Sequence, residues 1–283
     1  MTRSGIIGLR AALGLVLGAV ATLPAQAESR LERGRYLMQS VVACGNCHTP
    51  QGPNGPLPGM ELAGGLKIED KPFTAYSSNI TRDEDTGIGN WTDAQIITAI
   101  REGQRPDGSL IGPPMPIGLY RDMSDNDVKA IVAYLRAAKP VKNKVAKSEY
   151  RMPLPPSYGP PVGKVVDVKP KYTLPYGKYL AGPLGHCIEC HSAPGANGAP
   201  DLEGKLGMGG FSFFGPWGTS VSTNITPTGL SRYSDADLKK VITTGLRPDG
   251  TRLKPPMAVP YYAKMKPADL DALVAYLRTL PPK

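Results

Sequence analysis

Cysteine and histidine are scarce in this chain, whose 283 residues include four Cys and three His. The cysteines form two Cys-x-x-Cys pairs, each followed directly by a histidine, within 44–48 and 187–191. Because no cysteine is left over, a disulfide framework in addition to these pairs is excluded. Disulfides or zinc sites formed by the pairs themselves would leave the two following histidines unexplained.

Long apolar runs are missing after residue 27, and the run at 11–23 is shorter than the roughly 20 residues that a membrane-spanning helix requires. Arg3 and Arg10 accompany this run, and Ala25-Gln26-Ala27 has the small-x-small pattern of a signal-peptidase site. We expect a cleaved signal peptide over 1–27 rather than a retained anchor, and no transmembrane span in the mature chain. The expected location is the periplasm, with the protein either free or peripheral to the inner membrane.

Proline and glycine, by contrast, are abundant, with 30 Pro and 33 Gly. They are spread among periodic apolar segments, so we expect folded, loop-rich domains rather than disorder. A loop-rich domain of about 100 residues has little core of its own. A large apolar prosthetic group would complete such a core.

The two Cys-x-x-Cys-His motifs predict two covalently bound haem c groups. This spacing lets one turn of chain present both thiols to the haem and an imidazole to its iron. The predicted attachment residues are Cys44, Cys47, Cys187 and Cys190. His48 and His191 are the predicted proximal ligands, whereas His186, directly before Cys187, is expected to be a surface or supporting residue.

The two halves of the chain repeat one another at an offset of about 143 residues. The matching segments are Gly34-Arg35-Tyr36-Leu37 with Gly177-Lys178-Tyr179-Leu180, Asn79-Ile80-Thr81 with Asn224-Ile225-Thr226, Arg105-Pro106-Asp107-Gly108 with Arg247-Pro248-Asp249-Gly250, Pro113-Pro114-Met115 with Pro255-Pro256-Met257, and Ala133-Tyr134-Leu135-Arg136 with Ala275-Tyr276-Leu277-Arg278. We therefore expect two copies of one architecture, with domains at 28–138 and 173–283.

Each copy is predicted to be mostly helical, which makes the expected fold all-α. A first helix, at about 29–42 and 176–184, leads into the Cys-x-x-Cys-His turn. A middle helix is expected to begin after Thr92 or Ser234, with capping partners three residues later, and to end at Gly103 or Gly245. The last helix is expected to begin near Ser124 and at Pro267.

A stretch rich in Pro and Lys, residues 139–172, separates the two copies. This composition favours extended, semi-rigid backbone over regular secondary structure. We interpret it as a strap that joins the domains, either free or packed over a domain surface.

The distal iron ligands are predicted among the nine methionines, since thioether ligation is common in electron-transfer cytochromes. Met115 and Met257 each follow Pro-Pro in a loop between two expected helices, and proline limits the entropy lost in presenting the sulfur. Met123 and Met265 also match between the copies and are the alternative pair. Their position at the start of the last helix favours a core role.

Both copies resemble the class I cytochrome c domains in multihaem subunits of periplasmic alcohol, aldehyde and gluconate dehydrogenases. The motifs that carry the resemblance are Gly34-Arg35-Tyr36-Leu37, Cys44 to His48, Gly64-Gly65, Ser78-Asn79-Ile80-Thr81, Thr86-Gly87-Ile88-Gly89, Asp107-Gly108 and Pro114-Met115-Pro116. The resemblance implies that Met115 and Met257 are the sixth ligands. Those subunits usually carry three haems and a C-terminal membrane-associating segment, whereas we expect two domains in this sequence, which ends at Pro281-Pro282-Lys283. Their Pro-x-Gly is kept as Pro216-Trp217-Gly218 but lost in Pro72-Phe73-Thr74.

Charge is distributed unevenly between the copies. Residues 28–150 contain 15 Lys and Arg and 15 Asp and Glu, whereas 151–283 contain 16 and 9. This excess suggests that an acidic partner docks on the second copy, with a merely solvated basic face as the alternative. Nucleic acid is not a candidate partner for an exported dihaem chain.

Three functions fit two haem motifs. The favoured one is an electron carrier that accepts electrons from a periplasmic dehydrogenase and passes them to an oxidase or another cytochrome. The second is a dihaem enzyme, of the peroxidase or thiosulfate-oxidising type, with one displaceable distal ligand, and the third is a gas sensor. Matched methionines favour filled iron sites, and a Cys-ligated catalytic haem would need a fifth cysteine.

Overall fold

The computed structural model describes residues 1–2, 28–170, 172–196, 198–215 and 217–283. The expected signal peptide, apart from its first two residues, therefore lies outside the described residues. Among the residues described, no helix combines the length and apolar character needed to span a bilayer.

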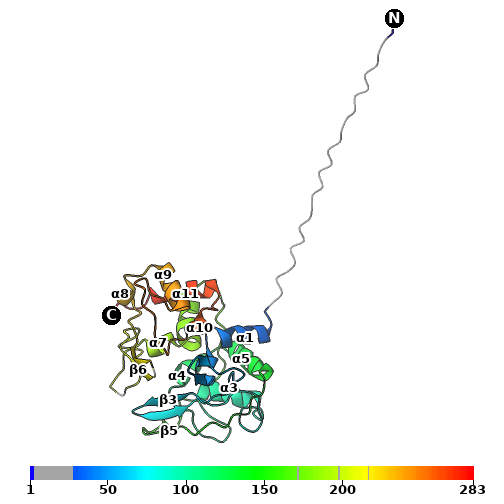
Figure 1. Cartoon of the computed structure of the whole chain (residues 1–283), viewed down its shortest axis with the longest axis vertical. Coiled ribbons are helices and arrows are strands. Elements are labelled where there is room, and N and C mark those ends of the chain that lie inside the picture. Colours follow the sequence, from blue (N-terminus) through cyan, green and yellow to red (C-terminus); the bar gives the residue numbers. More distant parts are fainter. Residues whose placement is uncertain (3–27, 171, 197, 216) are drawn as a thin grey trace.

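Each half contributes a set of helices (Figure 1). The first half has α1 (Arg30–Gln39), α2 (Cys44–His48), α3 (Asp93–Glu102), α4 (Ile117–Tyr120) and α5 (Asp125–Ala137). The second half has α6 (Leu174–Tyr179), a π-helical turn η1 (Leu180–Leu184), α7 (Cys187–Cys190), α8 (Pro227–Leu230), α9 (Asp235–Thr244), α10 (Val259–Tyr262) and α11 (Pro267–Leu277).

The prediction of an all-α fold is wrong, because the described residues also form short antiparallel sheets. These contain β1 (Gln51–Gly52) with β2 (Gly55–Pro56), β3 (Lys67–Asp70) with β4 (Phe73–Tyr76) and β5 (Glu149–Tyr150), and β6 (Ser212–Gly215) with β7 (Gly218–Val221). The registers of the β3–β4 and β6–β7 hairpins leave only two residues in each turn. Such tight turns join strands locally, and a search for helical periodicity passes over them.

The predicted ends of the middle helices are confirmed. Thr92 and Ser234 cap α3 and α9, and each forms a reciprocal capping box with the side chain three residues later. Gly103 and Gly245 end these helices with φ of 66° and 67°, a left-handed conformation that costs glycine little. The last helices, α5 and α11, also begin where predicted.

The first and last helices of each half pack closely. A Cβ on Gly34 of α1 would lie 1.9 Å from the carbonyl oxygen of Ala130 on α5. A Cβ on Gly177 of α6 would lie 2.1 Å from the carbonyl oxygen of Ala272 on α11. The glycine of each repeated Gly-x-Tyr-Leu segment therefore lets two helix backbones touch.

The strap over 139–172 packs on the first half, which decides between the two possibilities left open by its composition. The side-chain amide of Asn79 donates to the carbonyl of Val141 (2.8 Å), and Asn143 donates to the carbonyl of Ala63 (2.9 Å). Further along, β5 pairs with β4, and the Tyr158 hydroxyl donates to the carbonyl of Ile111 (2.7 Å). These bonds tie the extended chain to the first half along much of its length.

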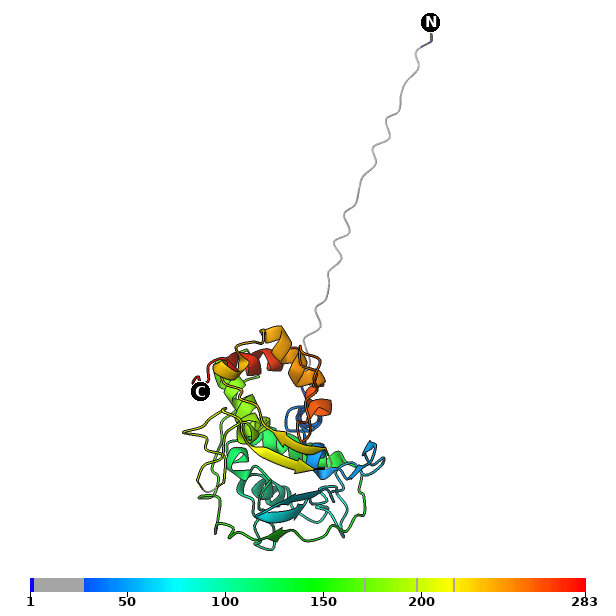
Figure 2. The same cartoon turned by 60° about the vertical axis from the view of Figure 1, so that its left-hand side comes forward.

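The two halves share one continuous hydrophobic core. Buried residues from α1 and α5 and from α6, η1 and α11 belong to a single packed cluster. In Figure 1 the second half lies above the first, with α4, α7 and α10 between them. The hairpins also meet, since β3 and β6 lie side by side (Figure 2).

Candidate haem sites

The predicted attachment residues lie on the short helices α2 and α7, which share an unusual entry. The residue before each helix, Ala43 or His186, has a positive φ, 52° or 38°. This left-handed residue turns the chain sharply out of the first helix, so that the helical turn with the cysteines starts in a new direction. All four cysteines are free thiols.

The imidazoles of His48 and His191 are held in the same way. Nδ1 of His48 lies 2.8 Å from the carbonyl oxygen of Ser78, and Nδ1 of His191 lies 2.7 Å from that of Thr223. A carbonyl can only accept, so Nδ1 carries the proton and the lone pair on Nε2 is left for a metal. A hydrogen bond of this kind fixes the ring and raises the basicity of a ligating histidine.

Gly64 and Gly209 let the chain pass close to the segment that carries the accepting carbonyl. A Cβ on Gly64, at φ 72°, would lie 2.4 Å from the carbonyl carbon of Ser78, and a Cβ on Gly209, at φ 70°, would lie 2.4 Å from that of Thr223. Each glycine N–H also donates to the carbonyl of the histidine itself, at 2.8 Å for His48. These glycines are part of the histidine support, which the Gly64-Gly65 motif signals in the sequence.

Burial sets the protonation of the imidazoles and thiols at both sites. It lowers the pKa of both His48 and His191, against the opposing effect of their hydrogen bonds to carbonyls, so neutral imidazoles are favoured. Burial also raises the pKa of Cys44 to about 12 and that of Cys187 to about 11. Neutral imidazole is the form that ligates a metal.

The two methionine loops have matching backbones. Ile117 N–H donates to the carbonyl of Met115 (2.8 Å), and Val259 N–H donates to that of Met257 (2.9 Å). Each methionine is partly buried against the shared core, and α4 or α10 begins within two residues of it.

The alternative pair lies deeper. Met123 is completely buried and Met265 is 7% exposed, and both belong to the hydrophobic core. The carbonyl of Met123 accepts from the buried guanidinium of Arg101 (Nε at 2.9 Å). These contacts support a core role for the alternative pair.

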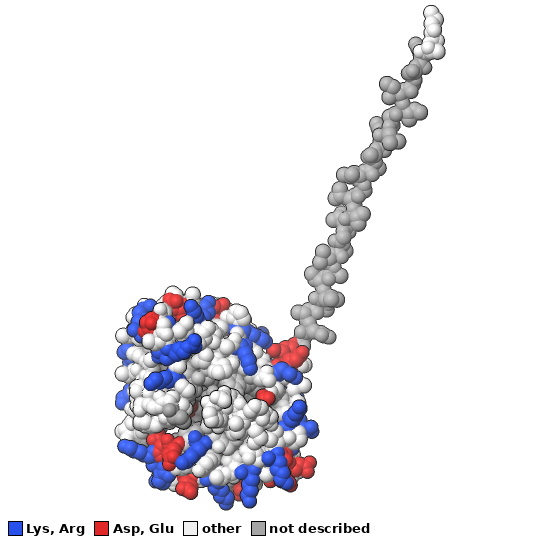
Figure 3. Space-filling model, in the orientation of Figure 1, with Lys and Arg blue, Asp and Glu red and all other residues white. Residues whose placement is uncertain are grey.

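Each Cys-x-x-Cys-His turn touches the methionine-bearing segment of the other half. The side-chain amide of Asn46 donates to the carbonyl of Pro256 (3.2 Å), and a Cβ on Gly45 would lie 2.4 Å from the Tyr261 hydroxyl oxygen. In the other direction, the rings of His186 and Tyr120 pack edge to face, with centroids 6.0 Å apart. The face in Figure 3 is largely uncharged and hollowed in this central region.

His186 is one residue that sequence reasoning placed only loosely. It lies between the halves, and burial lowers its pKa to about 4, against the effect of a hydrogen bond with the backbone of Val42. The repeat gives no information on the role of His186, because the residue at the matching position of the first copy is Ala43.

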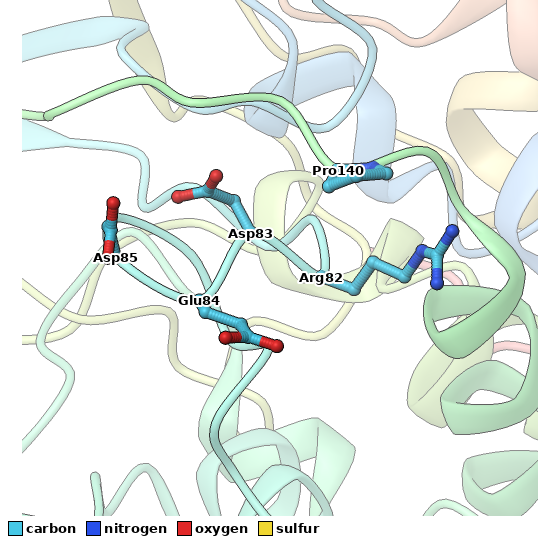
Figure 4. A pocket seen from close by; sticks show the side chains of 5 residues that line it. All are labelled: Arg82, Asp83, Glu84, Asp85 and Pro140. Carbon is cyan, nitrogen blue, oxygen red and sulfur yellow. The ribbon is translucent and has the colours of Figure 1, made fainter.

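A separate shallow hollow lies at the surface of the first half, lined by Arg82, Asp83, Glu84, Asp85 and Pro140 (Figure 4). Its carboxylates point in different directions. Asp83 accepts from the backbone and hydroxyl of Thr86 (both 2.7 Å), and Asp85 pairs with Lys142 (2.6 Å). These carboxylates hold the loop and strap together and belong to neither histidine site.

Two family models match the chain, one in each half. The model described as "Cytochrome c" matches residues 177–281, and that described as "Cytochrome C oxidase, cbb3-type, subunit III" matches 29–135. Both halves are cytochrome c domains. Electron transfer by haem is the chemistry typical of such domains.

Similar proteins include cytochrome subunits of dehydrogenases. The chain is 34% identical to the fructose dehydrogenase cytochrome subunit of Gluconobacter japonicus, over 89% of this chain and 53% of that protein. It is 32% identical to the cytochrome c subunit of the quinone alcohol dehydrogenase of Gluconobacter oxydans, over 96% of this chain and 60% of that subunit. The chain thus spans only part of these relatives. A "Diheme cytochrome c-type" protein of Cereibacter sphaeroides is 28% identical over 99% of both chains.

The side chains present at both sites fit haem c. Each site offers two free thiols one helical turn apart and an imidazole whose Nδ1 is hydrogen-bonded to a carbonyl. A haem bound there would supply an iron that accepts and releases one electron. The chain itself supplies the fixed imidazole and the nearby core.

Proposed function

We propose that this chain is a periplasmic dihaem c-type cytochrome that carries electrons from a dehydrogenase to a downstream acceptor, an oxidase or another cytochrome. One haem is attached at Cys44 and Cys47, and the other at Cys187 and Cys190. The observation that carries the proposal is the matched hydrogen bond from Nδ1 of His48 and of His191 to a backbone carbonyl. Rigidly held ligands suit electron transfer, because little then has to move when the iron changes charge.

The proposed distal ligands are Met115 for the first haem and Met257 for the second. Their loops match in backbone hydrogen bonding, and both sulfur-bearing side chains are partly exposed, whereas Met123 and Met265 are buried in the core. A filled sixth position in both domains favours a carrier over an enzyme or a gas sensor. The dehydrogenase donor is proposed from the relatives, which are named as dehydrogenase cytochrome subunits.

An optical spectrum of the haem-loaded protein tests the ligands. We expect the weak charge-transfer band between Met sulfur and ferric iron to be halved in Met115→Ala and in Met257→Ala and lost in the double variant. Met123→Ala and Met265→Ala are the matched controls, which we expect to destabilise the fold by about 2–5 kcal/mol without changing this band. A high-spin haem in the wild-type protein would contradict the proposal and favour an enzyme with an open iron site.

A further inference from the structure

The second hairpin, β6–β7, has an open edge where the first hairpin is covered. In the first half, β5 of the strap pairs with β4 through Phe73–Tyr150 and Thr74–Glu149. In the second half, the part of the chain that the structure describes places no third strand beside β7. An unpaired strand edge presents N–H and C=O groups to which another extended segment can bond.

The strap shows which contacts complete such an edge in this fold. The ring of Tyr150 lies 6.3 Å from that of Phe73, centroid to centroid, and Phe73 is only 8% exposed. Tyr150 also packs against Gly112, where a Cβ would lie 2.5 Å from its ring. Next to it, Arg151 donates to the carbonyl of Lys71 at the hairpin turn (2.9 Å). An extended segment therefore covers the first hairpin with both backbone and side chains.

The position in the second half that corresponds to Gly112 carries a charged residue. Lys254 stands before Pro-Pro-Met, where the first copy has Gly112. Its ammonium nitrogen lies 3.5 Å from the carbonyl oxygen of Thr219, which faces outward from β7. The edge of β7 thus offers a cation where the edge of β4 leaves room for an aromatic ring. Residues 173–283 as a whole contain 12 Lys and Arg against 8 Asp and Glu.

Exposed apolar side chains surround this edge. Phe214 is 61% exposed, Val221 is 56% exposed and Trp217, at the turn, is 36% exposed. Cross-strand pairing of Phe214 with Thr219 and of Ser212 with Val221 places Phe214 and Val221 on the same face of the hairpin. A cluster of large exposed apolar side chains on one hairpin marks an interaction surface, whereas a single one would not.

We propose that β7 is the docking edge for an extended, acidic segment of a partner protein. The segment adds a third strand to β6–β7, as β5 does to β3–β4, and sets a carboxylate against Lys254 and apolar side chains over Phe214 and Val221. Main-chain bonds then give affinity, and the side-chain contacts give specificity. This interaction goes beyond the proposed electron transfer and does not depend on it.

Other occupants fit the edge less well. In a second copy of this chain paired edge to edge, the two Lys254 side chains would come close together, and like charges repel. A lipid surface would cover the apolar side chains but would offer no strand to the main-chain groups of β7. The lysine and the open edge together favour the acidic strand.

A synthetic peptide tests the proposal on the full haem-loaded protein. The probe has the sequence of residues 145–152 with Lys147→Glu and Arg151→Glu, and titration calorimetry measures its binding. We expect saturable binding at one site, with the unmodified 145–152 peptide binding about tenfold more weakly because its basic side chains face Lys254. A probe that is N-methylated at the backbone amides facing β7 should not bind, because those amides can no longer donate hydrogen bonds to β7.

Variants of the protein locate the site. Thr219→Pro removes an outward N–H, and Lys254→Glu reverses the charge, and we expect each to weaken binding of the acidic probe by about tenfold or more. Lys254→Glu should also strengthen binding of the unmodified peptide. Lys240→Glu, an equal charge change at an exposed position of α9, is the control and should leave binding within about twofold.

Several results would overturn the inference. These are absence of saturable binding to the wild type, unchanged binding in both edge variants, a dimer in sedimentation that Thr219→Pro dissolves, or competition between the probe and phosphatidylglycerol vesicles. Far-ultraviolet circular dichroism and the haem spectrum check that each variant folds. If Thr219→Pro does not fold, the N-methylated probe and Lys254→Glu still decide the outcome.

Discussion

Tyr36 of the first half donates its hydroxyl to the Asp269 carboxylate of the second half, at 2.5 Å. The same oxygen accepts from the backbone N–H of Lys266 (3.1 Å), which precedes α11. The relationship is reciprocal, because Tyr179 donates to Asp127 (2.9 Å) and accepts from the N–H of Ser124 (2.9 Å), before α5. Each half therefore caps the last helix of the other with the tyrosine of its Gly-x-Tyr-Leu segment.

Removing these hydroxyl groups should weaken the joint between the halves. We expect Tyr36→Phe and Tyr179→Phe each to lower the free energy of unfolding by about 1–2 kcal/mol, because a buried carboxylate loses a donor and a helix start loses its acceptor. Urea unfolding followed by circular dichroism measures the change. Tyr134→Phe is the control, because it removes a hydroxyl that is hydrogen-bonded within the first half, to Gln39 (2.9 Å), and not between the halves. It should cost less than either, and equal stability of all three variants would contradict the capping role.

Adding one methyl group at Gly64 or Gly209 should disturb the histidine support. Because the new Cβ would collide with the backbone that holds the accepting carbonyl, we expect Gly64→Ala and Gly209→Ala to cost about 2 kcal/mol or more in unfolding free energy. Loss of the Nδ1 hydrogen bond makes the imidazole a weaker electron donor, so the reduction potential of the affected haem should rise. Redox titration measures it.

The control for these variants is Gly163→Ala, where no atom lies within 4 Å of the new Cβ and φ is not positive. We expect neither its stability nor either potential to change. Potentials that stay constant in Gly64→Ala and Gly209→Ala would show that the glycines support only the fold.

The strap should contribute to stability through Asn79. This buried side chain donates to the carbonyl of Val141 (2.8 Å) and accepts from the N–H and hydroxyl of Thr81 (2.9 and 2.8 Å). Asn79→Ala removes these three buried hydrogen bonds and should cost about 2–3 kcal/mol in unfolding free energy, measured by urea titration. The matched variant Asn224→Ala should cost less, since its partner, the carbonyl of Lys283, is exposed. Equal costs would argue against a special role for the strap.

Acid should weaken the ion pair between Arg101 and Asp125 (2.7 Å). The hydrogen bond from Arg101 holds the pKa of Asp125 below its ordinary value, so this pair stabilises the folded state above the unfolded pKa of about 3.9. That contribution is lost as the pH falls through the lower folded pKa. We expect Asp125→Asn to be less stable than the wild type at pH 7 and the difference to shrink as the pH falls below about 4.

Thermal unfolding at a series of pH values measures this difference. Asp122→Asn, at an exposed position three residues before the start of α5, makes the same charge change and should follow the wild-type curve. A difference that does not depend on pH would assign the effect of Asp125→Asn to packing.

Local chemistry could be read from the sequence wherever neighbouring residues decide it. The cap residues Thr92 and Ser234, and the glycines that end α3 and α9, act within a single turn and are confirmed. The repeated motifs also identified two cytochrome c domains, because haem attachment depends on a short spacing. Strands in two-residue hairpins were missed, since their stability comes from pairing across the turn rather than from a periodic pattern.

The sequence by itself determined two histidine sites in two matching copies, because the cysteines, the histidines and the repeat lie within short stretches of chain. Only the tertiary structure decided that the strap covers the first hairpin and leaves the edge of β7 open, and that His186 lies between the halves. It also decided that Tyr36 caps α11 of the second half and that Tyr179 caps α5 of the first half. Such contacts join residues up to 233 positions apart, and they form because burial of a shared core brings together groups that no local pattern connects.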